Sequence, residues 1–417
     1  MRDSKSTLFS YGDHDPVRES MVGTARCISY NLGPVRKAVR LCVQELPDLQ
    51  ELFSKAHSVL LKPNLLDSSR MPEAHINTHP HLVQAIGELL VQDYKCEVAI
   101  GDSCGTLRSG STADALRNSQ MDLAAKAVGA RLYNVDAQPR HVVPLERGRV
   151  LKEVTLPSNL GDFDLVVSIP KMKTHMLTLT TGAVKNMLGL MPGEAKKHAH
   201  MQAPRPSDFA ALLADLYTIV RPGAAFVDGI MAMEGAGPTN GVLRHVELVA
   251  ASCDGVALDS FCAQVMGLSP IDVPLLAQCH ERGLGIAVPE DIVVRGEPAS
   301  AFAPQKFAKP GTYSMGMPAN ILPRWVVREA VRQFGLHHAA IVQDKCKRCG
   351  ECAKNCPSHA IHYSKGGETF HVDRAACISC YCCAEVCPHD AIEVQAAWPK
   401  RMLDSLRAPF RPPGRAR

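Results

Sequence analysis

The stretch Leu165-Val-Val-Ser-Ile169, followed by Pro170-Lys171-Met-Lys173-Thr174-His175, is the most informative part of the sequence for the fold. A continuous apolar run of this length predicts a strand that is buried on both faces. Such strands occur in parallel sheets that are covered by helices on both sides. The polar residues come directly after the predicted strand, and ligands of such sheets bind beyond the carboxyl ends of the strands.

Short apolar runs alternate with longer helical stretches from about residue 24 to 300. Strands are predicted at 25–30, 59–61, 98–100, 131–133, 165–169, 225–227 and 247–250. Helices are predicted at 34–52, 81–93, 113–128, 209–220 and 256–266. This alternation indicates βαβ units, whose right-handed crossovers place helices on both faces of a sheet. The predicted fold is therefore α/β, with a mostly parallel, doubly wound sheet.

Lysines, amides and acids follow several of these strands, and such a set suits a small anionic ligand such as a carboxylate or phosphate. The expected substrate-binding residues are Lys62, Asn64, Lys171, Thr174, Lys185, Asn186, Asp228 and Glu234. The candidate catalytic residues are His175, Lys173 and Asp102, with His175 as general acid or base. We expect Lys62, Asp102, Lys173, His175, Lys185 and Asp228 to face one cleft. The acids could instead pair the lysines or bind a divalent cation, and solvated side chains at the rim are a further alternative.

Two groups of histidines could bind a metal ion or could simply be solvated. His75, His79 and His81 precede a predicted helix, and His198 and His200 follow two lysines. His-x-His spacing can hold a metal, but a loop rich in His and Lys is more often a solvated segment.

Several short motifs share this position after a strand: Lys62-Pro-Asn64, Gly101-Asp-Ser-Cys-Gly105, Thr181-Gly-Ala-Val-Lys185-Asn186 and Cys253-Asp254-Gly255. Their order and spacing resemble the DUF362 family over residues 24 to 300. Members of that family often carry a C-terminal two-cluster ferredoxin module. The resemblance implies architecture more firmly than activity. Relatives commonly have proline at the position of Cys104, so the resemblance implies no cysteine nucleophile there.

Nine of the sixteen cysteines lie between Cys346 and Cys387. The motif Cys346-x-x-Cys349-x-x-Cys352-x-x-x-Cys356-Pro357 recurs 31 residues later, from Cys377 to Pro388. In a chain without a secretory signal, such density indicates metal binding rather than disulfides. Zinc knots usually have two CxxC pairs with nothing between them, whereas this spacing is typical of two [4Fe–4S] clusters.

This duplicated motif resembles the bacterial two-cluster ferredoxins over about 55 residues, which implies a small C-terminal α+β iron–sulfur domain. In that family each cluster takes three thiolates from one motif and its fourth from the other. The resemblance therefore implies one cluster on Cys346, Cys349, Cys352 and Cys387, and another on Cys377, Cys380, Cys383 and Cys356. Cys382 adjoins a ligand and is treated as a non-ligand.

The chain is thus divided into an α/β domain (1–300), a Pro- and Gly-bearing connector (301–340) with a short helix near 325–334, the ferredoxin-like domain (341–396) and a basic tail (397–417). We expect the tail to be disordered, with docking of an acidic partner as the alternative. A formal charge of +4 gives no argument for nucleic acid binding. No window has the roughly 18 apolar residues of a membrane helix.

The function that these features predict is that of a cytoplasmic iron–sulfur oxidoreductase. Its two [4Fe–4S] clusters would pass electrons to or from a small anionic substrate in the α/β domain, with a redox partner protein on the other side. The sequence contains no GxGxxG motif, so it does not predict a binding site for a flavin or nicotinamide. The alternatives are an electron-transfer adaptor that docks a redox complex, and a non-redox enzyme with structural clusters.

Overall fold

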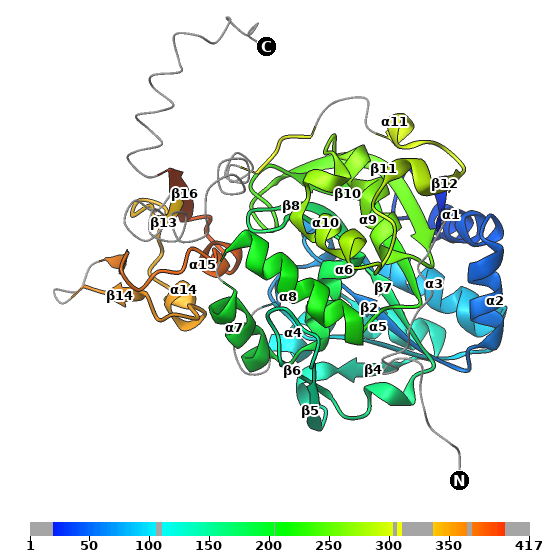
Figure 1. Cartoon of the computed structure of the whole chain (residues 1–417), viewed down its shortest axis with the longest axis horizontal. Coiled ribbons are helices and arrows are strands. Elements are labelled where there is room, and N and C mark those ends of the chain that lie inside the picture. Colours follow the sequence, from blue (N-terminus) through cyan, green and yellow to red (C-terminus); the bar gives the residue numbers. More distant parts are fainter. Residues whose placement is uncertain are drawn as a thin grey trace, which may run out of the picture. The chain divides into compact units, whose positions relative to one another are not determined.

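The computed structural model describes residues 20–105, 111–203, 205–302, 307–310, 337–364 and 369–396. The chain divides into two compact units, Met1–Pro310 and Gly311–Arg417, and each is described by itself (Figure 1). The predicted connector helix near 325–334 and the tail 397–417 lie outside the described residues. The domain boundaries of the sequence analysis therefore remain predictions. The first described strand of the second unit begins at His337, inside the predicted connector 301–340.

The first unit is built around a sheet that has ten strands among the described residues, with β8 and β9 attached beside the main order β12-β1-β11-β10-β7-β2-β3-β4. These strands are β1 (Ser20–Arg26), β2 (Ser58–Pro63), β3 (Glu97–Asp102), β4 (Arg131–Asn134), β7 (Leu165–Ile169), β8 (Lys171–His175), β9 (Leu179–Thr181), β10 (Ala224–Glu234), β11 (Val242–Ser252) and β12 (Ile292–Arg295). Neighbours are parallel, except where β11 pairs with β1 and β10 and where β8 pairs with β9. A separate hairpin joins β5 (Arg140–Pro144) and β6 (Glu153–Pro157). The mostly parallel sheet is confirmed.

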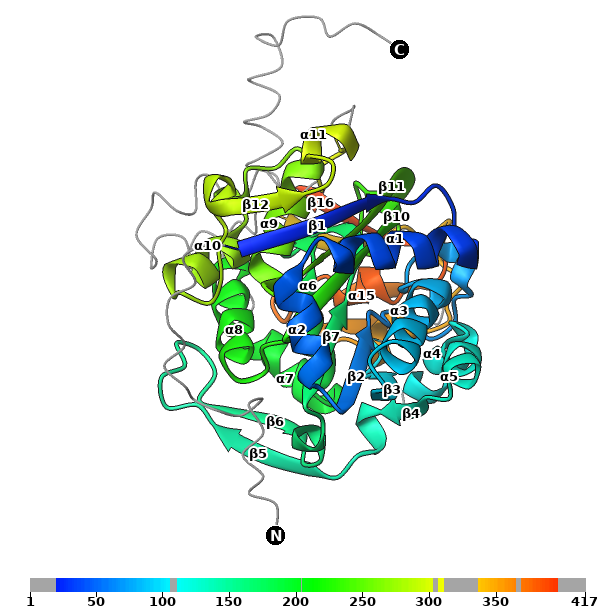
Figure 2. The ribbon, with the colours of Figure 1, turned by 90° about the vertical axis from the view of Figure 1, so that its right-hand side faces the viewer.

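Helices cover both faces of this sheet. The helices of the first unit are α1 (Leu32–Gln44), α2 (Pro47–Lys55), α3 (Pro80–Gln92), α4 (Ser111–Asn118), α5 (Met121–Val128), α6 (Ala183–Asn186), α7 (Gly193–Gln202), α8 (Pro206–Ile219), α9 (Gly255–Val265), α10 (Pro274–Glu281) and α11 (Ala299–Phe302). The layer of α1 to α5 shares one apolar core with the sheet, and α1, α2 and α3 lie in front of the strands in Figure 2. The helices α6, α8, α9 and α10 pack together on the other side. Among the described helices, none has the length and apolar character to cross a bilayer.

Two of the predicted helices are each divided in two. The stretch 34–52 forms α1 and α2, because Pro47 disfavours helical backbone at Leu46, whose φ is −124° and ψ is 88°. Proline itself is accepted in the first turn of α2, since its missing N–H would have no partner there. The stretch 113–128 divides at Gln120, which has left-handed backbone with φ of 60°. The apolar periodicity continues across both breaks, which is why the sequence predicts single helices.

The strand-end motif after Pro170 is itself a strand. Lys171 to His175 form β8, which pairs with the outer half of β10 so that Lys171 lies opposite Asp228. Both β10 and β11 extend well beyond the predicted 225–227 and 247–250. Because β11 is antiparallel to its neighbours, its motif at Asp254 lies at the opposite edge from the other strand-end motifs. There Asp254 caps α9 by accepting hydrogen bonds from the backbone N–H groups of Val256 (2.8 Å) and Ala257 (3.2 Å).

The short helix α6 is held in place by Asp259 of α9. The carboxylate of Asp259 accepts hydrogen bonds from the backbone N–H groups of Ala183 (2.6 Å) and Val184 (3.0 Å), which have no partner within the helix. A Cβ on Gly182 would lie 2.2 Å from Asp259 Oδ1, so only glycine fits before the helix. This contact fixes Lys185 and Asn186 beside the ends of β2 and β3.

The second unit is a small α+β domain with an internal repeat. The strands β13 (His337–Ile341) and β16 (Ile392–Ala396) pair antiparallel, as do β14 (Ile361–Tyr363) and β15 (Phe370–Val372). One short helix follows each cysteine loop, α14 (Glu351–Lys354) in the first half and α15 (Cys382–Glu385) in the second. The ferredoxin-like architecture is confirmed.

We predict that residues 1–310 fold without iron, because the sheet and its two helical layers bury their own core. Residues 311–417 should need iron, because two short two-stranded sheets bury too little apolar surface to fold alone. Far-UV circular dichroism of the two fragments, with and without reconstituted iron and sulfide, measures this. An unfolded 1–310 fragment would contradict it.

We also predict that stability depends on the ionisation of Asp259. Burial raises the pKa of Asp259 from its ordinary 3.8 to about 7, against the effect of its two backbone hydrogen bonds. The folded chain therefore binds one more proton than the unfolded chain between these values. The contribution of Asp259 to the free energy of unfolding should fall as the pH rises through this window, by at most about 1.4 kcal/mol per pH unit, and stay constant above it.

Denaturant unfolding of the wild type and of Asp259→Asn at several pH values measures this contribution. The stability advantage of the wild type should shrink as the pH rises, because asparagine does not titrate. An advantage that grows with pH would show a lowered pKa instead.

Candidate functional site

Two lysine–aspartate pairs of the described chain are buried at the carboxyl ends of the parallel strands. Lys62 Nζ of β2 lies 2.7 Å from Asp102 Oδ1 of β3, and Lys171 Nζ of β8 lies 3.1 Å from Asp228 Oδ2 of β10. None of the four side chains is more than 2% exposed. Buried charges of this kind need a counter-charge and further hydrogen bonds, and the surrounding chain supplies them.

The ammonium group of Lys62 is bonded entirely within the domain. Besides Asp102 it donates to Asn186 Oδ1 (3.0 Å) and to the carbonyl of Pro63 (3.1 Å). Asn186 in turn donates to the carbonyl of Lys62 and to Ser168 Oγ, both at 3.1 Å. Burial lowers the pKa of Lys62, and attraction to Asp102 opposes that shift.

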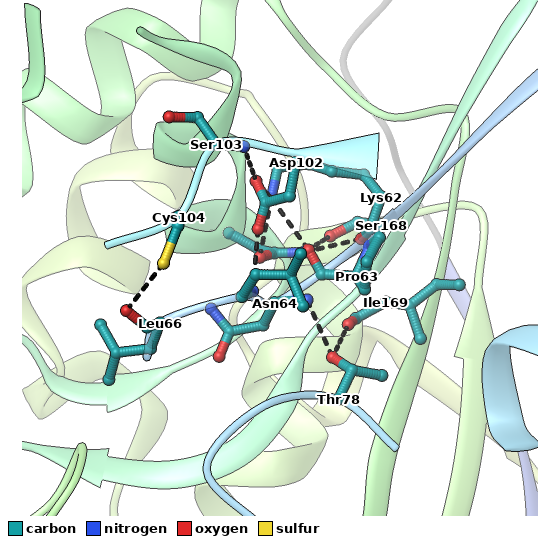
Figure 3. A network of polar contacts seen from close by, with 12 residues as sticks. Lys62, Pro63, Asn64, Leu66, Thr78, Asp102, Ser103, Cys104, Ser168 and Ile169 are labelled. Atoms are coloured by element: carbon teal, nitrogen blue, oxygen red, sulfur yellow. Dashed lines mark hydrogen bonds and ion pairs between the residues drawn. The ribbon is translucent and has the colours of Figure 1, made fainter. Parts of the chain in front are cut away.

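The carboxylate of Asp102 is the centre of the contacts in Figure 3, where it faces Lys62 from the neighbouring strand. It accepts hydrogen bonds from the backbone N–H groups of Leu65 (2.8 Å) and Ser103 (2.9 Å). Burial raises the pKa of Asp102, and Lys62 opposes that shift. A Cβ on Gly189 would lie 2.0 Å from Asp102 Oδ1 and 2.7 Å from Lys62 Nζ, so the backbone at Gly189 closes over the pair.

The second pair is completed by Tyr30, which the sequence analysis did not select. Lys171 Nζ donates to Tyr30 Oη (2.6 Å), and Tyr30 Oη donates to Asp228 Oδ1 (2.6 Å). The backbone N–H of His79 donates to Asp228 Oδ2 (2.9 Å). Burial and the charge of Asp228 raise the pKa of Tyr30 well above its ordinary value, so Tyr30 is a neutral phenol. Its position after β1, a strand of the same sheet, is the signal that could have identified it.

The histidine-rich loop packs on Tyr30. The rings of Tyr30 and His79 are stacked, with centroids 3.9 Å apart, and His75 stacks at 5.3 Å. His81 Nδ1 lies 2.7 Å from the carbonyl oxygen of Tyr30. Burial lowers the pKa of His79 to about 3 and, together with Lys171, also lowers the pKa of His75. The half-buried rings of His75 and His79 are therefore neutral near pH 7.

The remaining residues of β8 also face inward. Lys173 Nζ donates to the carbonyl of Ile76 (2.8 Å), and Thr174 Oγ1 donates to the carbonyl of Gly235 (3.1 Å). His175 Nδ1 accepts a hydrogen bond from the backbone N–H of Leu177 (3.0 Å), which places the proton of a neutral ring on Nε2. His175 is 2% exposed.

A fourth buried lysine, Lys196 of α7, was also missed by the sequence analysis. Its Nζ donates to Ser103 Oγ (2.7 Å) and to the carbonyls of Ser103 (2.9 Å) and Cys104 (2.6 Å). The thiol of Cys104 is 1% exposed and donates to the carbonyl of Leu66 (3.3 Å). Lys196 does not follow a strand. The sequence analysis selected polar residues that come directly after predicted strands, so it did not select Lys196.

The structure thus brings the predicted residues into separate networks. One contains Lys62, Asp102 and Asn186, and another contains Lys171 and Asp228. Glu234 lies apart, at the far end of β10, where its carboxylate pairs with Arg244 (2.5 Å) and accepts from the backbone N–H of Ala308 (3.0 Å). Of the predicted binding residues, Asn64, Lys185 and Glu234 keep partly exposed side chains, and the buried Asn64 Oδ1 has no hydrogen-bond partner in the described chain.

Eight cysteines of the small domain surround two cavities. The first cavity is lined by Cys346, Cys349, Cys352 and Cys387. The second is lined by Cys356, Cys377, Cys380 and Cys383. Backbone N–H groups point at the sulfurs: Ala391 donates to Cys387 Sγ (3.3 Å) and Ala360 to Cys356 Sγ (3.2 Å). Cys382 is buried but lines neither cavity.

These cavities fit a cage of iron and sulfide better than a single ion. Four thiolates around a hollow can reach the corners of a [4Fe–4S] cube, and backbone N–H groups stabilise the negative sulfurs. Among the described residues, no three His, Cys, Asp or Glu side chains are placed to hold one metal ion. A mononuclear zinc site needs its ligand side chains to converge on one point in this way.

Comparison with known proteins agrees with the architecture of the small domain. A model described as a 4Fe-4S dicluster domain matches residues 345–391. The Ferredoxin of Chlorobaculum thiosulfatiphilum is 37% identical over 60 residues, which are 13% of this chain and 95% of that protein. The small domain is therefore a ferredoxin-type 4Fe-4S domain.

The α/β domain has its own relatives. The lactate racemase apoprotein of Thermoanaerobacterium thermosaccharolyticum has a TM-score of 0.40 at 12% identity, over 62% of this chain and 60% of that chain, less than two thirds of either. The Thylakoid-associated protein sll1697 of Synechocystis sp. is 31% identical over 271 residues, which cover 63% of this chain and 79% of that protein. The model described as "Domain of unknown function (DUF362)" matches residues 59–264. The chain therefore belongs to the DUF362 family.

Proposed function

We propose that this protein is an oxidoreductase that passes electrons through two [4Fe–4S] clusters to or from a small anionic substrate bound by the α/β domain. The observation that supports it most is the division of eight cysteines between two cavities, each with three residues from one motif and one from the other. A [4Fe–4S] cluster supplies one-electron chemistry, and paired clusters are typical of electron carriers. We further propose a redox partner protein and a cytoplasmic location.

The chain's own residues would hold the clusters as in the bacterial ferredoxins. The first cavity would use Cys346, Cys349, Cys352 and Cys387, and the second Cys377, Cys380, Cys383 and Cys356. Each fourth ligand comes from the other motif, so each cluster ties the two halves of the repeat together. The N–H groups of Ala360 and Ala391 stabilise thiolate charge and thereby favour the reduced state.

The substrate would bind at the carboxyl edge of the sheet. Lys185 is half-buried there, and its charge acts on Lys62. The rings of His75 and His79 lie close enough to Lys171 for its charge to help lower their pKa values, so both rings stay neutral. Asn64 adds an amide whose buried oxygen accepts no hydrogen bond from any residue that the structure describes. An anionic group suits this edge because the partly exposed Lys185 adds positive charge there.

The second candidate is an electron-transfer adaptor, and one observation favours it. The ammonium groups of Lys62, Lys171 and Lys173 are fully buried and bond to internal oxygens. Ion pairs of this kind stabilise one arrangement of the sheet edge without any ligand. An adaptor would retain the clusters and bind a partner protein, but it would not respond to small anions.

Two measurements separate these functions. Anaerobic purification with iron and sulfide analysis and EPR of the dithionite-reduced protein tests for the clusters. Thermal-shift screening with carboxylates and phosphates tests the anion site, with Lys185→Gln as the variant and exposed Lys37→Gln as the matched control. A shift that Lys185→Gln abolishes and Lys37→Gln retains supports the oxidoreductase. Intact clusters without any shift would favour the adaptor.

We predict that the fourth ligands cross between the motifs. Cys356→Ala should damage the cluster of Cys377, Cys380 and Cys383, and Cys387→Ala the other, so each variant should lose about half of the roughly eight iron atoms of two clusters. Cys382→Ala, next to a ligand, is the matched control and should keep its iron. Iron analysis and EPR measure both effects. Equal losses in Cys382→Ala and Cys380→Ala would overturn this ligand assignment.

We also predict that the Lys62–Asp102 pair is needed for stability. Lys62→Met leaves the Asp102 carboxylate buried without a counter-charge and should lower the free energy of unfolding by about 3–5 kcal/mol. The double variant Lys62→Met/Asp102→Leu should cost less than the sum of the single variants, because it removes both charges. Denaturant unfolding measures these values, with exposed Lys37→Met as control. Additive effects would show that the two groups do not interact.

A further inference from the structure

The two cysteine loops are equivalent in the repeat but differ in the residues between the ligands. The first loop is Cys346-Lys347-Arg348-Cys349-Gly350, and the second loop is Cys377-Ile378-Ser379-Cys380-Tyr381. Gly350 and Tyr381 occupy the same place and share left-handed backbone, with φ of 77° and 63°. The loops therefore have matching backbone at this position, and their differences lie in the side chains.

The cysteines that line the first cavity are more exposed than those that line the second. Cys349 is exposed, whereas its equivalent Cys380 is only 7% exposed. Tyr381 is 3% exposed and lines the second cavity. At Gly350 an added Cβ would meet only Phe370, at 3.6 Å, so the first loop has room for a side chain that it lacks.

The first loop also carries free positive charge. Lys347 and Arg348 are exposed, and neither makes an ion pair with any residue that the structure describes. The nearby lysines differ, because Lys345 pairs with Glu393 (3.3 Å) and Lys354 with Glu351 (3.1 Å). The second loop has neutral Ile378 and Ser379 at the equivalent positions. The charge next to an exposed cysteine ligand is thus confined to one half of the repeat.

We infer that electrons enter and leave the small domain at the first cavity, where the loop 346–350 docks a redox protein with an acidic surface. This inference rests on the proposed function, because it requires both clusters. The exposed residue Cys349 brings the partner close to the first cluster, and Lys347 and Arg348 steer an acidic partner to it. Tyr381 shields the second cluster, which exchanges electrons through the first. Each transfer would move one electron between the first cluster and the partner, so that one of them is oxidised as the other is reduced.

The test uses the full-length, iron-loaded chain reduced with dithionite. Stopped-flow absorbance follows its one-electron oxidation by the anionic cobalt(III)–EDTA complex and by cationic hexaamminecobalt(III). Lys347→Gln/Arg348→Gln should slow the anionic oxidant by on the order of three- to tenfold and speed the cationic one, and both effects should vanish at high salt. Arg117→Gln/Lys126→Gln, which removes two charges from the α/β domain, should leave both rates unchanged.

A second readout does not depend on electron transfer. An anionic dysprosium chelate relaxes the EPR signal of a cluster that it can approach, so it should relax the first cluster more than the second. Gly350→Tyr should reduce that relaxation and Tyr381→Gly should extend it to the second cluster. Iron analysis and circular dichroism show whether these two variants fold and bind iron. If they do not, Lys347→Gln/Arg348→Gln provides the test.

The outcomes separate this inference from the proposed function. Slower reaction with the anionic oxidant and relaxation of one cluster support the inference. The inference alone would be overturned if Lys347→Gln/Arg348→Gln left the oxidation rates of the iron-loaded protein unchanged. Equal relaxation of the two clusters would also overturn it. A chain that binds no iron would overturn the proposed function and this inference together.

Discussion

A lysine with no exposed surface must find its oxygen partners inside the protein, and this constraint organises the carboxyl edge of the sheet. Lys62 obtains them from β3, from α6 and from its own strand. Gly189 has no side chain because Asp102 occupies the space, and Gly182 has none because of Asp259. The polar edge is therefore packed as tightly as an apolar core, and its charges determine which backbone can lie beside them.

The sheet could be predicted because its signals are local. Leu165 to Ile169 are apolar on both faces, and that pattern requires a covered parallel strand wherever the rest of the chain lies. The divided helices could not be predicted from periodicity, because Pro47 and Gln120 interrupt the backbone without interrupting the apolar pattern. The continuation of β7 into β8 also escaped prediction, since the partner that makes Lys171 a strand residue is β10.

The two candidate sites differ in the same way. The cysteine spacing lies within one short repeat, so both ligand sets can be proposed from the sequence. The burial of Lys171 depends on Tyr30 and Asp228, which the sequence places far away, and strand-end position alone suggested that the lysine was available to a ligand. Tyr30 itself was assigned to a strand, although β1 ends at Arg26. Local patterns thus predict which residues are near the edge, and distant partners decide which of them remain accessible.

The distance between these partners along the chain has a consequence for the order of folding. Tyr30 and Asp228 are 198 residues apart, Lys171 and Tyr30 are 141 apart, and Lys62 and Asn186 are 124 apart. Closing such long loops costs entropy before any contact is gained, so folding that depends on them is slow. The strands and their apolar helices can assemble while the ammonium groups remain hydrated. Synthesis must pass Asp228 before Tyr30 and Lys171 can both contact its carboxylate.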